Sequence, residues 1–221
     1  MANRVRVWDL PTRVFHWTLV LGVVSLVVTA KVGGAAMVWH FRIGYMVLAL
    51  LLFRLVWGFV GGHWSRFSAF LYSPRTVLRY VRGQGSIELE VGHNPLGALS
   101  VLSMLVFLFL QLASGLISDD EIAASGPFAS LVPSAWVSRA TFYHADVGQI
   151  IVLALAGLHV GAILFYLLRK RVNLVRPMIR GDKDVDVPAT SSRDDRRSRG
   201  LAAVLLLACL GLVLYALRFA P

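Results

Sequence analysis

Apolar residues in this chain form long, nearly unbroken blocks instead of the spaced stripe of a soluble amphipathic helix. A helix of about 20 apolar residues is long enough to cross the roughly 30 Å hydrocarbon core of a bilayer. Five blocks meet or approach that length, and the spans they predict are Val14–Ala30, Met37–Val60, Leu96–Ile117, Phe142–Leu168 and Leu201–Leu217. The pattern therefore predicts an all-α membrane protein.

Composition agrees with a membrane protein and excludes several kinds of metal centre. Hydrophobic residues make up 57% of the chain and charged residues only 15%, whereas soluble domains carry about 25% charged residues. The only cysteine is Cys209, and there is no Cys-x-x-Cys-His motif. The sequence thus excludes a covalently attached c-type haem, and also a thiolate-bound zinc or iron–sulfur centre within this chain.

The net charge of +10 would suggest nucleic-acid binding in a soluble protein, but here it predicts topology. Seventeen of the 22 Lys and Arg residues lie at the N-terminus, between spans two and three, or between spans four and five. Basic loops stay on the cytoplasmic side. We therefore expect a multi-pass membrane protein, with the N-terminus on the cytoplasmic side and the C-terminus on the outer side, which is the periplasm if the membrane is a bacterial inner membrane.

This topology assigns roles to the segments between the spans. Residues 1–180 are predicted to form a four-helix bundle, residues 181–200 a polar, solvated cytoplasmic linker, and residues 201–221 a separate C-terminal transmembrane helix. The longest outer loop carries the acidic run Asp119, Asp120 and Glu121. We interpret this run as either a docking surface for a periplasmic protein or a solvated loop.

Four of the six histidines lie in or at the ends of the apolar spans, where an ionisable side chain is costly and usually functional. The topology places His16 and His159 towards the inner face, and His40 and His144 towards the outer face. The 15 residues from His144 to His159 correspond to roughly 22 Å of helix rise and leave the two side chains about 60° apart around the helix. The sequence thus predicts two histidine pairs, although any one histidine could simply be packed and hydrogen-bonded.

Two histidines on facing helices can bind a haem iron from opposite sides, which leaves no open coordination position and favours electron transfer. Zinc fits less well, because it needs three or four clustered protein ligands. Gly44 and Gly148 each follow a histidine of the outer pair by four residues, so they share its helix face and leave room for a flat macrocycle. Close helix packing is the alternative explanation for these glycines.

Two further polar residues lie near the predicted inner pair. Arg54 shares the face of His40 and is expected to bind a haem propionate, or else to extend to the membrane surface. His93 precedes span three and is expected to cap that helix or lie in solvent; binding of a quinone head group is the alternative.

Several segments together resemble the bacterial cytochrome b561 family, and more closely the b-type cytochrome subunits of nickel–iron hydrogenases. In chain order they read "PTRVFHW", "WHFRIGYMVLALLLFRLVWGF", "GHNPLGALS" and "FYHADVGQIIVLALAGLHVGA". The resemblance covers about residues 5 to 180. It implies a four-helix core with two haem b groups, and His16, His40, His144 and His159 as the iron ligands.

The resemblance implies electron transfer between a periplasmic partner, either a cytochrome c or a hydrogenase-type protein, and a quinone such as ubiquinone or menaquinone. It leaves the electron donor and the direction of flow open, and the fifth span lies outside it. Two other functions remain open at this point. One is a stand-alone oxidoreductase acting on quinol or a small oxidant, and the other is a haem-free transporter that uses histidines to relay protons or metal ions.

Overall fold

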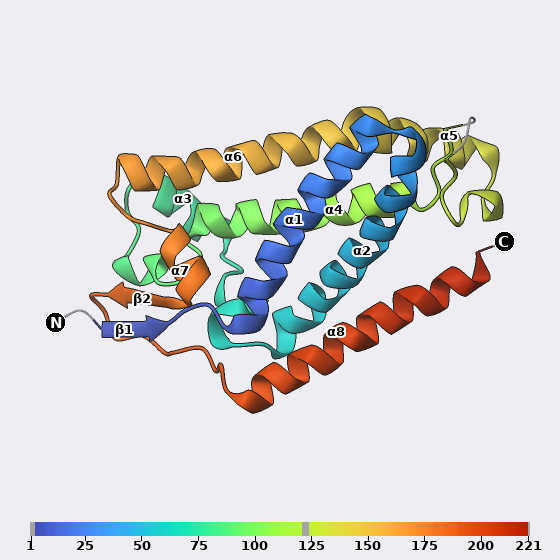
Figure 1. The fold of residues 1–221 in the computed structure, drawn as a ribbon. Helices are drawn as coiled ribbons and strands as arrows, with labels where there is room; N and C mark the ends of the chain where they lie inside the picture. Colours follow the sequence, from blue (N-terminus) through green and yellow to red (C-terminus); the bar gives the residue numbers. More distant parts are fainter. Residues whose placement is uncertain (1–2, 121–123, 221) are drawn as a thin grey trace. The chain divides into compact units, whose positions relative to one another are not determined.

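The computed structural model describes residues 3–120 and 124–220. Its five long helices are α1 (Leu10–Val32), α2 (Met37–Val60), α4 (Pro95–Gly115), α6 (Gln149–Leu168) and α8 (Arg196–Ala216) (Figure 1). Five helical segments, each containing one of these helices, are long and apolar enough to cross a membrane. The expectation of an all-α, multi-pass membrane protein is thereby confirmed. The second span has the bounds predicted for it.

Shorter elements connect the long helices. The short helices are α3 (Pro74–Val81), α5 (Ser134–Phe142), α7 (Val175–Arg180) and a π-helical segment, η6 (Tyr143–Gly148). Two strands, β1 (Asn3–Arg6) and β2 (Asp182–Val185), form an antiparallel pair. The 3-10 turns are η1 (Gly34–Ala36), η2 (His63–Ser65), η3 (Phe67–Ala69), η4 (Ile87–Glu90), η5 (Ala129–Leu131) and η7 (Leu217–Phe219).

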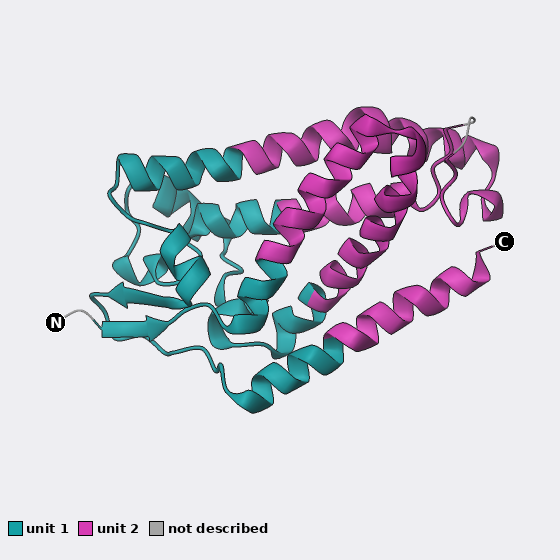
Figure 2. Cartoon of the chain, viewed as in Figure 1, with its two compact units in different colours: residues 1–16, 54–103, 158–205 teal, residues 17–53, 104–157, 206–221 magenta. Residues whose placement is uncertain are grey.

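The chain divides into two compact units (Figure 2). Unit 1 comprises residues 1–16, 54–103 and 158–205, and unit 2 comprises residues 17–53, 104–157 and 206–221. Helices α1, α2, α4, α6 and α8 each contribute residues to both units. The histidine pair His16 and His159 belongs to unit 1, and the pair His40 and His144 belongs to unit 2.

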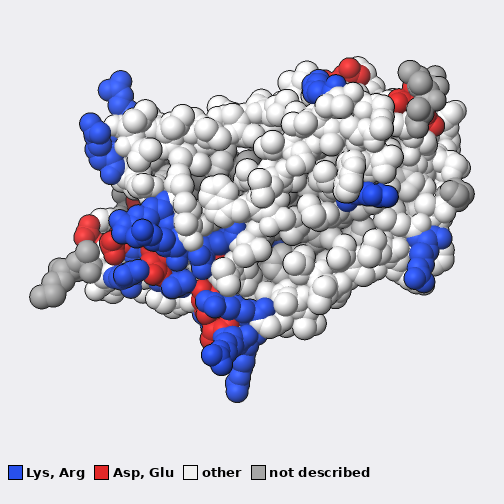
Figure 3. Space-filling view, in the orientation of Figure 1, with Lys and Arg blue, Asp and Glu red and all other residues white. Residues whose placement is uncertain are grey.

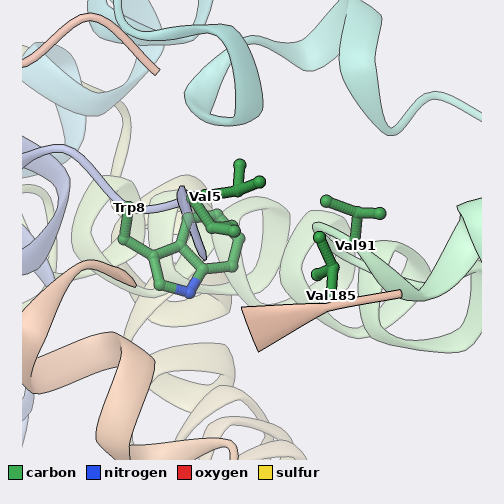
Figure 4. Packing of buried hydrophobic residues seen from close by; sticks show 5 residues of the cluster. Val5, Trp8, Val91 and Val185 are labelled. Atoms are coloured by element: carbon green, nitrogen blue, oxygen red, sulfur yellow. The ribbon is translucent and has the colours of Figure 1, made fainter. Parts of the chain in front are cut away.

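Unit 1 has a small apolar core built on the two strands (Figure 4). Its buried members are Val5, Val7, Trp8, Val91 and Val185. The strand register pairs Asn3 with Val185 and Arg6 with Asp182. Each strand contributes one residue to this core, Val5 from β1 and Val185 from β2. Burying several large apolar side chains is the main source of stability for such a cluster.

The strand pair corrects the expectation that residues 181–200 form a solvated linker. Ser192 is buried: its backbone N–H donates to the Arg6 carbonyl (2.7 Å) and its hydroxyl donates to the Val7 carbonyl (2.8 Å). Composition alone missed this, because the polar side chains are satisfied by the N-terminal strand, nearly 200 residues away in sequence. Helix α8 also begins earlier than predicted, at Arg196, since Asp195 caps it by accepting from the Ser198 N–H (2.7 Å).

Asp194 connects the segment before α8 to the N-terminal region. Its carboxylate accepts hydrogen bonds from Arg6 (2.9 Å), Arg199 (2.9 Å) and the backbone N–H of Leu10 (3.1 Å). Burial alone would raise the pKa of this carboxyl, but the hydrogen bonds from Arg199 and Leu10 and the charge of Arg6 hold the pKa below its usual value. Asp194 therefore stays ionised and keeps the N-terminal region tied to the start of α8.

Asp9, which is fully buried, fixes the start of α1. As the residue before the helix it caps the first turn, accepting from the Thr12 N–H at 2.9 Å. It also accepts from the Gly62 N–H and the Ser65 hydroxyl, each at 2.9 Å. A Cβ on Gly62 would lie 2.4 Å from the Asp9 carboxylate, so only glycine fits there. These bonds hold the end of α2 against the start of α1 within unit 1.

The outer loop of unit 2 is folded where the structure describes it. The backbone N–H of Asp119 donates to the Thr141 hydroxyl (3.0 Å), and Asp120 accepts from the Ala124 N–H (2.8 Å). Glu121, the third member of the acidic run, lies outside the described residues. The predicted docking role of this run stays a prediction.

Candidate functional site

The histidine pair of unit 2 is formed by His40 on α2 and His144 on the π-helical segment. The ring centres lie 6.1 Å apart, with an angle of 87° between the ring planes. Nδ1 of His40 lies 3.0 Å from the Leu26 carbonyl oxygen, and Nδ1 of His144 lies 2.8 Å from the Gln111 carbonyl oxygen. A carbonyl oxygen only accepts, so each Nδ1 must donate its proton. Nε2 of both rings is then the nitrogen able to bind a metal, as is usual for metal-binding histidines.

The spacing of this pair fits an iron atom between the two rings. An imidazole nitrogen binds a transition metal at about 2 Å, and the ring centre lies about 1 Å behind it, so two axial ligands place their ring centres roughly 6 Å apart. Among the described residues, no group of three or more His, Cys, Asp or Glu side chains could hold a metal ion. Two histidines are enough for a haem iron, because the macrocycle supplies the other four nitrogens.

A cavity of about 430 Å³ adjoins this pair within unit 2. His40, His144 and Gly44 line it, together with mainly apolar residues of α1, α2, α4 and α6. A Cβ on Gly44 would meet only Leu26, at 3.9 Å, so the space beside this residue is open. Gly44 thus lies where its predicted role in binding a macrocycle requires. An apolar cavity of this size is typical of a cofactor site.

Gly148 lies elsewhere in unit 2. It is not among the residues that line the cavity, and a Cβ there would lie 2.1 Å from the Gln111 side-chain oxygen and 2.7 Å from the Tyr143 ring. Its contacts therefore explain the glycine by close packing, the alternative given above. Gly115 was not found from the sequence: a Cβ on it would lie 2.7 Å from the His144 ring. Gly115 and the Gln111 carbonyl together position His144.

The π-helical segment around His144 was also missed from the sequence. Residues Tyr143–Gly148 wind more loosely than an α-helix, and such segments often lie at functional sites. The constant 100° per residue assumed between His144 and His159 does not hold across these six residues. No local composition signal marks the segment, since its geometry depends on how His144 is held by α4.

The histidine pair of unit 1 is formed by His16 on α1 and His159 on α6. Their ring centres lie 6.4 Å apart, with 55° between the ring planes, which fits the same iron-centred arrangement. Gly161 follows His159, and a Cβ on this glycine would meet nothing within 4 Å. Each pair inferred from depth along the sequence is thus brought together in the structure.

Arg54 is buried in unit 1, with only 3% of its surface exposed. Its guanidinium carbon lies 4.9 Å from the centre of the Phe67 ring and 6.0 Å from that of Phe70. Among the described residues, its Nη1 atom has no hydrogen-bond partner. A buried cationic donor of this kind suits an anionic ligand such as a propionate, and this assignment stays a prediction.

His93 is packed between two aromatic rings instead of lying in solvent. Its ring centre lies 4.6 Å from that of Trp8 and 4.6 Å from that of Phe70. The capping role expected of it belongs to Asn94, whose side chain accepts from the Gly97 N–H (2.8 Å) at the start of α4. Nδ1 of His93 is buried and, within the described part of the chain, has no hydrogen-bond partner. His93 therefore offers a polar atom in an aromatic surrounding.

His93 and Arg54 belong to the surroundings of the unit 1 histidine pair. Both side chains contact the same ring, because the Phe70 ring centre lies 4.6 Å from that of His93 and 6.0 Å from the guanidinium carbon of Arg54. Unit 1, which contains the His16 and His159 pair, thus also contains two polar side chains that each have a buried atom lacking a partner among the described residues. Two groups able to bind a ligand besides the haem are thereby available there.

Comparison with known proteins agrees with this geometry. Residues 7–181 match the family model described as prokaryotic cytochrome b561. A probable Ni/Fe-hydrogenase B-type cytochrome subunit of Bradyrhizobium diazoefficiens is 26% identical over 140 residues, covering 50% of this chain and 56% of the relative. Proteins of the same description from Azotobacter vinelandii (26% over 138 residues) and Azotobacter chroococcum (29% over 129 residues) each align over 46% of this chain and 53% of their own length.

The chain therefore spans about half the length of the curated relatives it matches. The family match covers four of the five long helices and both histidine pairs, whereas α8 follows the matched residues. The family implies haem b as the cofactor and electron transfer in a membrane as the activity, and the histidine geometry fits both. The chain belongs to the prokaryotic cytochrome b561 family.

Proposed function

We propose that this protein transfers electrons across the bacterial inner membrane through two haem b groups, between a redox partner protein and the quinone pool. His16 and His159 would hold one haem iron, and His40 and His144 would hold the other. The observation that carries the proposal is the spacing of the two pairs, with ring centres 6.4 Å and 6.1 Å apart. Two such pairs in one chain support two cofactors.

The haem supplies one-electron chemistry when it is bound, and the chain's residues determine how it is used. Two histidines would hold each haem iron and leave no position open, which would favour electron transfer over oxygen binding. The Nδ1 hydrogen bonds of His40 and His144 to backbone carbonyls fix the orientation of both rings. A rigid ligand pair changes little between the oxidised and reduced states, so the transfer needs little rearrangement of the protein.

Charge supports a cytoplasmic location for the β1, β2 and α7 region. Lys and Arg side chains gather over these elements in unit 1 (Figure 3), and cytoplasmic segments of membrane proteins are enriched in such residues. The N-terminus is then cytoplasmic, and the five spans place the C-terminus in the periplasm. The His40 and His144 pair faces the periplasmic side in this orientation.

The partner and the quinone belong to opposite ends of this pathway. The names of the relatives support a hydrogenase-type partner for this chain, and a periplasmic cytochrome c is the alternative. Ubiquinone or menaquinone would react near the unit 1 pair, where His93 and Arg54 provide polar atoms for a carbonyl oxygen. Histidine beside an aqueous face can also pass the proton that quinone reduction requires.

Haem content of the purified protein tests the proposal. Pyridine haemochrome titration should approach two haems b per chain, and acid acetone should extract them, because no cysteine lies near enough to either histidine pair in sequence for a thioether attachment motif. A value near zero would contradict the proposal and favour the histidine-based transporter. A value near one would contradict the assignment of one of the two pairs.

A further inference from the structure

A basic cavity borders the end of helix α6 in unit 1. Its volume is about 310 Å³, which lies at the lower end of the roughly 300–1,000 Å³ typical of small-molecule sites. Five basic side chains line it: Arg4, Arg171, Arg176, Arg180 and Lys183. Two acidic residues, Asp182 and Asp184, also belong to the lining, so positive charge is in excess.

Some of this charge is already neutralised. Asp182 pairs with Arg4 at 3.0 Å and with Arg6 at 2.6 Å. The Lys183 ammonium donates to the carbonyl oxygens of Glu90 and Val91, and burial lowers its pKa. These groups therefore stabilise the strand pair and are not available to a ligand.

Three arginines of the cavity remain available. Among the described residues, Arg171, Arg176 and Arg180 make no ion pair. All three are exposed, so a ligand from the solvent or from the lipid can reach them. The guanidinium group binds phosphate oxygens through two parallel N–H donors. Several arginines around one cavity therefore suit a phosphate group better than an uncharged ligand.

The backbone between α6 and α7 is folded in a defined way, with Arg171 in this loop and Arg176 and Arg180 on α7. Arg171 has φ of +57°, in the left-handed region that a non-glycine residue adopts only at an energetic cost. The side chain of Asn173 then accepts from the backbone N–H groups of Val175 and Arg176, at 3.0 and 2.9 Å. The loop therefore does not rely on a ligand to form, which reduces the entropy lost on binding.

We propose that this cavity binds a phosphate group carried by an anionic phospholipid. The cavity begins three residues after α6, a helix apolar enough to cross a membrane, so its arginines lie at the level where a lipid phosphate is found. Leu168 and Val172 beside it are 62% and 39% exposed, and they provide apolar contact for the acyl chains. Basic pockets at the cytoplasmic ends of membrane helices are suited to anionic headgroups.

Native mass spectrometry of the full chain, released from nanodiscs of phosphatidylcholine with phosphatidylglycerol, tests this proposal. The wild-type chain should retain phosphatidylglycerol, and the triple variant Arg171→Gln, Arg176→Gln, Arg180→Gln should retain at least about tenfold less. The control triple Arg75→Gln, Arg79→Gln, Arg82→Gln removes the same charge from α3 and the residue that follows it, and should retain wild-type amounts. The single variant Arg176→Gln, with a several-fold loss, provides the test if the triple variant does not fold.

Two results would overturn the proposal. One is full retention of phosphatidylglycerol by the cavity variants, and the other is an equal loss in the α3 control, which would mean that surface charge alone attracts the lipid. Inorganic phosphate, titrated into protein in pure phosphatidylcholine nanodiscs, distinguishes the source. Tight binding of phosphate alone, lost in the cavity triple, would assign the site to a soluble phosphate compound and contradict the lipid. Circular dichroism confirms the fold of each variant, and neither measurement depends on haem content.

Discussion

The two histidine pairs have similar spacing but different surroundings. In unit 2, His40 and His144 are each fixed by a backbone carbonyl and border an apolar cavity. Unit 1, which contains His16 and His159, also contains the buried Arg54 and His93, which is packed between aromatic rings. The spacing lets both pairs bind a haem iron, whereas the surroundings determine whether a site can also bind a second ligand or exchange a proton.

This difference assigns separate tasks to the two units. The unit 2 site is mainly apolar and its histidines are held by backbone carbonyls, which suits the transfer of an electron without a proton. The unit 1 site has groups that can donate a hydrogen bond or a proton, and Arg54 and His93 each have a buried atom without a partner in the described part of the chain. We therefore expect proton-coupled chemistry at unit 1 and protein docking at unit 2.

The largest expected effect is the separate loss of one haem. His144→Ala should remove the unit 2 haem and His159→Ala the unit 1 haem, each lowering the content from about two haems to about one, because a haem that loses an axial histidine loses much of its binding energy. Pyridine haemochrome titration and low-temperature reduced spectra measure this. The pairing is contradicted if His40→Ala and His144→Ala remove different spectral components.

Substitution of Gly115 tests whether the unit 2 pair is held by packing. Gly115→Ala places a Cβ 2.7 Å from the His144 ring, so the ring must move and the haem it binds should weaken or change its reduced spectrum. Gly211→Ala on α8, where nothing lies within 4 Å of the added Cβ, is the matched control. A wild-type spectrum for Gly115→Ala would show that the ring has room to adjust.

The sequence predicted the features that depend on local pattern. The five spans followed from long apolar blocks, and both histidine pairs followed from depth, because helix rise converts sequence separation into distance. Arg54 is buried, as expected of a residue that binds a ligand inside the bundle, and Gly44 lines the cavity beside His40. Their roles in cofactor binding stay predictions.

The features that the sequence missed depend on contacts between distant segments. The strand pair joins residues 3–6 to residues 182–185. In neither segment do apolar and polar residues alternate clearly enough to predict a strand. Gly115 and the Gln111 carbonyl act on His144 from another helix. Such partners appear only once the helices are packed.

The third prediction concerns quinol at unit 1. His93→Ala and Arg54→Gln, in protein that keeps both haems, should each slow reduction of the unit 1 haem by quinol by about tenfold, the loss expected when one hydrogen bond worth about 1.5 kcal/mol is removed. Reduction of the unit 2 haem by a periplasmic donor should keep its wild-type rate. Stopped-flow absorbance measures both, and unchanged quinol rates in both variants would place the quinone elsewhere.

The fourth prediction concerns docking at unit 2. Replacing Asp119, Asp120 and Glu121 with Ser should slow reduction by a basic cytochrome c a few-fold at low salt, because complementary charge raises encounter rates and salt screens it. The control replaces Asp186, an exposed acidic residue of unit 1, with Ser and should leave this rate unchanged. An unchanged rate and salt slope in the loop variant would make the acidic run an ordinary solvated loop.

The smallest expected effect is a pH dependence confined to unit 1. Hydrogen bonds and neighbouring arginines lower the pKa of Asp194 in the folded protein despite its burial. A carboxyl with a lowered folded pKa stabilises the fold at pH values above its unfolded pKa of about 4, and that stability is lost as the pH falls through the lower folded value. The melting temperature of the wild type should therefore fall more steeply below about pH 4 than that of Asp194→Asn, which lacks the titrating group. Asp186→Asn, an exposed neighbour, should follow the wild type, and parallel curves for Asp194→Asn and the wild type would show that this cluster does not hold the start of α8.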